Sequence, residues 1–123
     1  MGHAEQHKTP VQAALELYAA LRDSRLPDVA ALTTAGVLCK PLTRPGLSLY
    51  HGHQGMADLA RSLHAVHGDY AVTIISATEQ PGPRVTIRDR IDPQPGHGPP
   101  LHATTVYTFR DGLIATITSE PDD

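Results

Sequence analysis

The sequence predicts an α+β fold, in which helices come first and an antiparallel sheet follows. Apolar residues recur at spacings of three and four in the first half, which is typical of helices on a core. After Gly68 the period changes to two, and runs rich in β-branched residues alternate with turns. Helices segregated from strands indicate the α+β class, and 123 residues suffice for one domain. The predicted domain covers residues 9–123, after a polar, disordered arm over residues 1–8.

The first helix has strong local signals at its start. Thr9 is predicted to cap it, Pro10 fits the first helical position, and Gln12 completes a capping box with Thr9. The helix is expected to end near residues 23–25. Its apolar face consists of Val11, Ala14, Leu15, Tyr18 and Leu21.

The segment after the first helix is less regular. Pro27 is predicted to open a second, short helix, which Gly36 is expected to stop. Residues 37–39 form a short predicted strand, residues 40–46 a loop rich in Pro and Gly, and residues 47–50 a brief extended piece.

A third helix over residues 54–67 precedes the main sheet. Met56 lies on its apolar face, and Gly68 follows its last turn, where glycine commonly ends a helix. The pair Asp111-Gly112 predicts a tight hairpin turn between the last two strands. The four long strands are predicted over residues 70–78, 84–92, 102–110 and 113–119.

Composition argues against several classes of partner. A net charge of −3 with 19% charged residues disfavours binding to nucleic acid or to an anionic membrane. No apolar run approaches the length that crosses a membrane, and the N-terminus lacks a signal-peptide core, so we expect a cytoplasmic protein. Because aromatic residues are only 4% and Trp is absent, a ligand pocket should have mainly aliphatic walls. This favours a small or aliphatic ligand.

The cysteine and the histidines give no sign of a metal site. Cys39 is the single cysteine, so it cannot form an internal disulfide, and we expect it to be a small buried residue. His51 and His53 form one histidine pair and His64 and His67 another, but neither pair has a third ligand at a suitable spacing. No metal or other cofactor is therefore predicted.

Three strings carry a family resemblance: LELYAALRDSRLPDVAALT over residues 15–33, LYHGHQGMADL over 49–59 and TTVYTFRDGLIATITSEPD over 104–122. In order and spacing they resemble the SnoaL-like branch of the nuclear-transport-factor-2-like superfamily. The resemblance implies a cystatin-like α+β barrel, a curved antiparallel sheet around three helices with a cone-shaped cavity, usually as a homodimer. The superfamily includes ketosteroid isomerase, limonene epoxide hydrolase, polyketide cyclases and non-catalytic binding modules, so the fold does not settle the function.

The predicted strand over residues 84–92 has two different faces. Arg88, Arg90 and Asp92 share one face, and Val85, Ile87, Asp89 and Ile91 share the other. Arg90-x-Asp92 resembles the pair in limonene epoxide hydrolase, which faces the cavity and whose aspartate protonates the epoxide oxygen. The resemblance implies that Asp92 carries the proton and that Arg90 sets its protonation state. The residue pattern alone favours the alternative, in which the apolar face turns inward and the arginines are solvated or at a dimer contact.

The other sites known in the family are incomplete in this sequence. Tyr18 matches the tyrosine that donates a hydrogen bond to the oxyanion in ketosteroid isomerase, although a core tyrosine is the simpler alternative. The base of that isomerase falls near Lys40 and Pro41, and its buried acid falls near Thr105. The second aspartate of the epoxide hydrolase falls at Ser119, and the histidine and aspartate of the cyclases fall at Thr105 and Ser119.

The leading prediction is a cofactor-free acid–base enzyme of the epoxide hydrolase, cyclase or isomerase type, acting on a small, largely apolar molecule. Asp92 and Arg90 are its predicted catalytic residues. The residues predicted to contact the substrate are Tyr18, Tyr107, Ser119, Thr105, Phe109 and Met56. The alternatives are a non-catalytic module that binds a small ligand, and a protein-interaction domain that uses the outer sheet face. Asp92 inside a closed, polar-lined cavity would favour the enzyme. A wholly apolar cavity would favour the binding module, and a filled interior without a cavity would favour the interaction domain.

Overall fold

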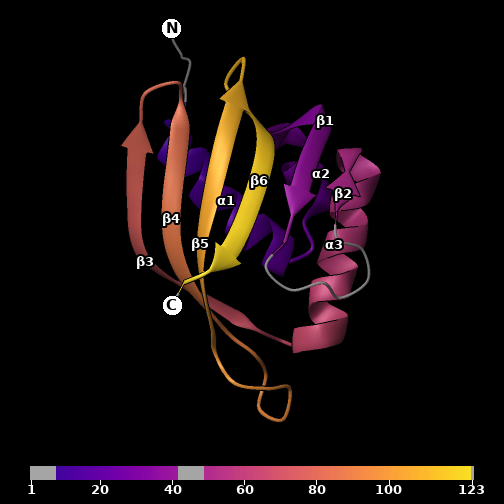
Figure 1. The fold of residues 1–123 in the computed structure, drawn as a ribbon. Coiled ribbons are helices and arrows are strands. Elements are labelled where there is room, and N and C mark those ends of the chain that lie inside the picture. The colour runs from indigo at the N-terminus through magenta and orange to yellow at the C-terminus, as the bar shows by residue number, and fades with distance from the viewer. Residues whose placement is uncertain (1–7, 42–48, 123) are drawn as a thin grey trace, which may run out of the picture.

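The computed structural model describes residues 8–41 and 49–122, which form helices packed on a sheet (Figure 1). The predicted arm, apart from Lys8, and the parts of the predicted loop and extended piece over residues 42–48 lie outside the described residues. None of the described helices is long and apolar enough to cross a membrane. The elements are α1 (Pro10–Arg22), α2 (Leu26–Leu32), β1 (Thr33–Lys40), β2 (Tyr50–His51), α3 (Gly52–His67), β3 (Ala71–Gln80), β4 (Arg84–Asp92), β5 (Leu101–Arg110) and β6 (Leu113–Pro121).

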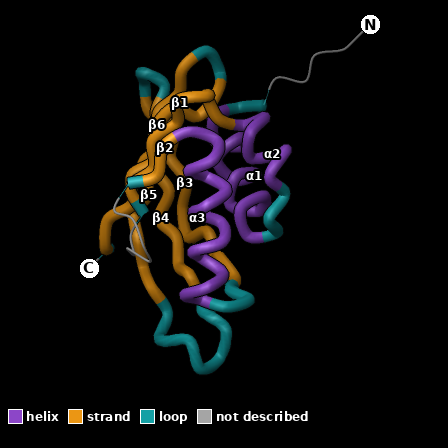
Figure 2. Tube along the Cα trace, turned by 90° about the vertical axis from the view of Figure 1, so that its right-hand side faces the viewer, coloured by secondary structure: helices purple, strands orange, loops and turns teal. Residues whose placement is uncertain are grey.

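The described strands form one sheet in the order β2-β1-β6-β5-β4-β3. The sheet is open and curved, and the three helices lie along one of its faces (Figure 2). Neighbouring strands run antiparallel except β1 and β6, which are parallel. The predicted antiparallel sheet is thus present in β3 to β6, and β1 is added to it parallel to β6. No tight turn joins β1 to β6, so their relative direction is not restricted to antiparallel.

Helix α1 begins as the sequence predicts. The Thr9 hydroxyl accepts a hydrogen bond from the Gln12 backbone N–H at 3.1 Å, and the Gln12 side chain accepts one from the Thr9 N–H at 2.9 Å. This confirms the capping box, and with Pro10 in the first turn it fixes where the helix starts. The helix ends at Arg22, one residue before the predicted range.

The end of α2 differs from the prediction. The helix stops at Leu32 and β1 starts at once with Thr33, whose hydroxyl donates to the Val29 carbonyl oxygen at 2.8 Å. Gly36 therefore does not stop the helix but lies inside the strand. The β-branched side chain of Thr33 favours extended backbone and satisfies a carbonyl at the helix end, so the chain changes direction without a glycine.

The last four strands match their predicted positions closely. Strand β4 has the predicted bounds, because a turn on one side and a loop rich in Pro and Gly on the other leave little freedom. Asp111 and Gly112 both have positive φ, +54° and +81°, as the predicted tight hairpin turn requires.

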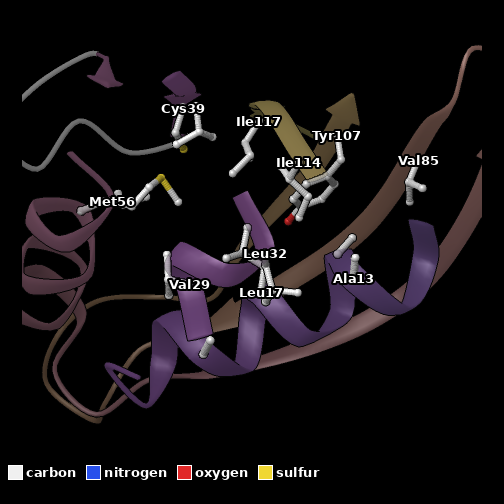
Figure 3. Close-up of a cluster of buried hydrophobic side chains, with 14 of the residues drawn as sticks. Ala13, Leu17, Val29, Leu32, Cys39, Met56, Val85, Tyr107, Ile114 and Ile117 are labelled. Atoms are coloured by element: carbon white, nitrogen blue, oxygen red, sulfur yellow. The ribbon is translucent and has the colours of Figure 1, made fainter. Parts of the chain in front are cut away.

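A hydrophobic core fills the space between the helices and the sheet (Figure 3). Leu17 from α1, Met56 from α3 and Ile114 from β6 belong to one buried cluster and are 1%, 0% and 0% exposed. In β4, Val85 and Ile87 are fully buried while Arg88 is exposed. The apolar face of this strand therefore turns toward the helices, which decides between the two alternatives that the sequence leaves open.

Candidate functional site

A cavity of about 80 Å³ lies between α1, α3 and the sheet. Its walls come from both helices, from β1 and from strands β3 to β6, and most of the lining side chains are aliphatic, as the composition predicts. Leu63, Ile91 and Ser119 line it and are only half-buried, so the cavity is not fully enclosed. Its polar groups are therefore the candidates for chemistry.

Asp89 is the buried acid of this cavity. Its side chain projects from the inward face of β4, and the residue is only 2% exposed. Its Oδ2 accepts a hydrogen bond from the Tyr18 hydroxyl of α1 at 2.5 Å and another from the Thr105 hydroxyl of β5 at 3.0 Å. Thr105 in turn shares a hydrogen bond of 2.9 Å with Ser119 of β6. Four side chains from four elements thus form one polar network.

The surroundings of Asp89 favour its neutral form more than water does. Burial raises the pKa of its carboxyl, and the hydrogen bonds from Tyr18 and Thr105 lower the pKa by a smaller amount. No ion pair joins Asp89 to a basic side chain within the described ranges. A carboxyl in these surroundings is suited to taking up and releasing a proton.

Tyr18 and Tyr107 pack together beside this carboxyl. Their ring centroids lie 5.9 Å apart at an interplanar angle of 69°, an edge-to-face arrangement. Burial raises the pKa of both phenols, and the nearby carboxylate of Asp89 adds to the effect on Tyr18. Tyr18 therefore stays protonated and acts as a hydrogen-bond donor.

The predicted catalytic pair lies on the other face of the sheet. Arg90 Nε is 3.1 Å from the Asp92 carboxylate, and the two side chains are 41% and 35% exposed. Neither residue lines the cavity. The expectation that this pair faces the cavity is corrected, because the alternating pleat of β4 turns Asp89 inward and Arg90 outward.

The six predicted contact residues divide into two groups. Tyr18, Tyr107, Thr105 and Ser119 line the cavity, and the structure brings them together around Asp89. Met56 and Phe109 do not line it: Met56 is 0% exposed inside the core, and Phe109 packs against that core from β5. Substrate contact by the first four stays a prediction.

Sequence reasoning missed Asp89 as a site residue, although a signal was present. An acid between Ile87 and Ile91, at the period-two spacing of an apolar strand face, must be buried if that face is buried. Cys39 and Tyr70 also line the cavity. Burial raises the pKa of the Cys39 thiol to about 12, so the thiol stays neutral, and its predicted burial is confirmed.

Within residues 8–41 and 49–122, no three His, Cys, Asp or Glu side chains are grouped so that they could hold a metal ion. His53 and His64 instead contact backbone carbonyl oxygens: His53 Nε2 lies 3.3 Å from that of Thr33, and His64 Nε2 lies 2.7 Å from that of Arg22. These two histidines therefore have structural partners.

The family follows from a direct sequence match. The family model described as the SnoaL-like domain matches residues 14–117, which is most of the chain. This chain belongs to the SnoaL-like domain family. The resemblance to the SnoaL-like family seen in the three strings is thereby confirmed. No curated protein matches the sequence significantly.

Solved structures share the fold of this SnoaL-like domain at low sequence identity. TerC, co-crystallised with polyporic acid, is 21% identical with a TM-score of 0.73, over 91% of this chain and 90% of its own. An epoxide hydrolase of the limonene epoxide hydrolase type from M. tuberculosis is 19% identical with a TM-score of 0.69, over 91% and 81%. A cystatin-fold protein from Novosphingobium aromaticivorans is 17% identical with a TM-score of 0.73, over 91% and 97%. These likenesses establish the α+β fold class.

Proposed function

We propose that this SnoaL-like domain binds a small, mostly apolar organic molecule in the cavity and transfers a proton on it, with Asp89 as the acid–base group. One observation carries the proposal. Asp89 is 2% exposed, lines a largely aliphatic cavity and is held by two hydroxyl donors. Burying a carboxylate costs several kcal/mol in folding, so such a group is a strong candidate for a functional site.

The two oxygens of the Asp89 carboxylate have different surroundings. Both hydrogen bonds end on Oδ2, and Oδ1 accepts none from the residues that the structure describes. Oδ1 is therefore the atom that can take a proton from a C–H or O–H group of the ligand. The resulting neutral acid then returns this proton to a different atom of the ligand. The sum of the two steps is an isomerisation that needs no other reactant.

Among the three predicted reaction types, isomerisation suits this site best. Hydrolysis of an epoxide needs one group to protonate the oxygen and another to activate water. The position of the second acid is Ser119, whose hydroxyl is hydrogen-bonded to Thr105. A single carboxylate that takes and returns one proton fits the residues at hand.

The cavity volume limits the ligand. At about 80 Å³ it is smaller than the roughly 150 Å³ of an engineered apolar cavity that binds benzene. We therefore expect a ligand smaller than benzene, or a larger one that places only its reacting end inside. A carbonyl group would make a neighbouring C–H acidic enough for Asp89 to remove its proton.

The test uses short β,γ-unsaturated ketones such as allyl methyl ketone, with the conjugated product followed by its ultraviolet absorbance. Asp89→Asn should lower the rate about 10²–10⁴-fold, because a general base is removed. Asp92→Asn is the matched control: it removes a carboxylate from the same strand, but on the outer face, and should keep the wild-type rate. Equal rates in wild type and Asp89→Asn would contradict the proposal.

A non-catalytic binding module is the second candidate, because Ser119 replaces the second acid of the epoxide hydrolases. It would bind short ketones, as detected by chemical-shift changes of the cavity residues, without isomerising them. Assembly as a homodimer and a cytoplasmic location stay predictions from the sequence.

A further inference from the structure

Thr105 and Ser119 form a row of hydroxyls that leads across the sheet to Asp89. The three residues lie on the inward faces of the adjacent strands β5, β6 and β4. Thr105 and Ser119 are direct cross-strand partners, and Thr105 is 3% exposed. The strand register therefore holds the row in place.

The hydrogen bonds in this row have a defined direction. Each hydroxyl has one proton to donate. Thr105 donates its proton to Asp89 Oδ2 at 3.0 Å, so in the 2.9 Å contact with Ser119 it can only accept. The chain of donors therefore runs from Ser119 to Thr105 to Asp89.

We propose that Thr105 and Ser119 are positioning residues for Asp89 rather than groups that bind the substrate. Thr105 and Tyr18 hold Oδ2 from two sides, which fixes the carboxyl group and presents Oδ1 to the cavity. Ser119 fixes the orientation of the Thr105 hydroxyl. The proposal rests on the proposed function only in taking Asp89 as the acid–base group.

This role follows from the hydrogen-bonding capacity that each hydroxyl retains. The Thr105 proton is used on Asp89 and the Ser119 proton on Thr105, so neither hydroxyl has a proton left to donate to a ligand. Donors to a carboxylate stabilise its charged form and oppose the effect of burial. Removing the Thr105 hydroxyl should therefore make Asp89 harder to ionise even when no ligand is bound.

The experiment measures the pKa of Asp89 in the full chain by NMR titration of its ¹³C-labelled carboxyl group. Thr105→Val should raise this pKa by about one unit or more, because a hydrogen bond to a charged group is lost. Thr105→Ser keeps the hydroxyl and should return the pKa to its wild-type value. Ser119→Ala should raise the pKa by a smaller amount.

Thr104→Val is the matched control, since Thr104 pairs with Arg88 in β5–β4 and faces away from the cavity. It should leave the Asp89 titration unchanged. An unchanged pKa in Thr105→Val, or a raised pKa that Thr105→Ser fails to restore, would overturn the inference. If Thr105→Val does not fold, an unchanged pKa in Ser119→Ala overturns it instead. Because no substrate is needed, the result is independent of whether Asp89→Asn loses isomerase activity.

Discussion

Asp89 and His67 are both buried, and they differ in how their polar atoms are satisfied. Asp89 receives two hydrogen bonds from hydroxyl groups, which offset part of the cost of burying a carboxylate. His67 is 3% exposed, and neither of its ring nitrogens has a hydrogen-bond partner among the described residues. One buried group is thus built into a network, while the other is tolerated at a cost in stability.

His67 should make the stability of the fold depend on pH. Burial lowers the pKa of its imidazole below the usual 6.5, and His97 adds a smaller effect in the same direction. The unfolded chain therefore binds this proton more tightly than the folded protein does. The contribution of neutral His67 to the stability of the fold is fully present above pH 6.5. It is lost as the pH falls from 6.5 through the lowered pKa of His67 in the folded protein.

The variant His67→Leu should remove this pH dependence. Urea unfolding should show a gain of about 1 kcal/mol at pH 7.5, because two unsatisfied nitrogens are lost, and a larger gain at pH 5. The exposed His102→Gln variant controls for the loss of one histidine. An equal gain at both pH values would show that His67 does not titrate with folding.

At the scale of elements, the end of α3 is fastened to the loop that follows β4. Gln94 donates its backbone N–H to the His67 carbonyl oxygen at 2.8 Å, and its side chain accepts from the Asp69 N–H at 2.8 Å. Gly68 lies between these contacts with φ of +68°, and a Cβ there would be 2.5 Å from the Gln94 side-chain oxygen. This junction therefore requires glycine for both its backbone angle and its space.

Gly68→Ala should be more destabilising than the same change at a turn where a Cβ has open space. Gly82 also has positive φ, +114°, but a Cβ there would meet nothing within 4 Å. Gly82→Ala should therefore lower the free energy of unfolding by the backbone cost alone, about 1 kcal/mol. In urea unfolding, Gly68→Ala should lower it by more than that. If the two variants lose similar amounts of unfolding free energy, the side chain of Gln94 moves aside freely and the explanation by space at Gly68 is wrong.

Local signals in the sequence predict most of the elements. The bounds of β4 are correct because turn-forming residues stand on both sides, and the start of α1 is correct because its cap is specified locally. The predicted apolar face of α1 is only partly right, since Leu17 is buried and Leu15 is exposed. Strand β1 is longer than predicted because it pairs with β6 at Thr33 and again from Leu38, while Gly36 lies in the register shift between these two positions. Long-range pairing is not visible in local spacing.

At the scale of the whole molecule, the site is made where four elements meet. The apolar face of α1 predicts that Tyr18 turns inward, and the structure places it on the cavity. Which face of β4 turns inward could not be decided, because a shift of one residue exchanges Asp89 for Arg90. The family resemblance pointed to the charged face, whereas burial of Val85 and Ile87 decides for the other.

The proposed function requires Asp89 to move a proton on a small ligand inside this cavity. The most direct measurement is the exchange of the α-hydrogens of butanone for deuterium in D₂O, followed by proton NMR with wild type, Asp89→Asn and Asp92→Asn. Exchange should be faster than in buffer for wild type and Asp92→Asn, and should occur at the buffer rate for Asp89→Asn. Exchange that persists in Asp89→Asn, or that is lost only in Asp92→Asn, would contradict it.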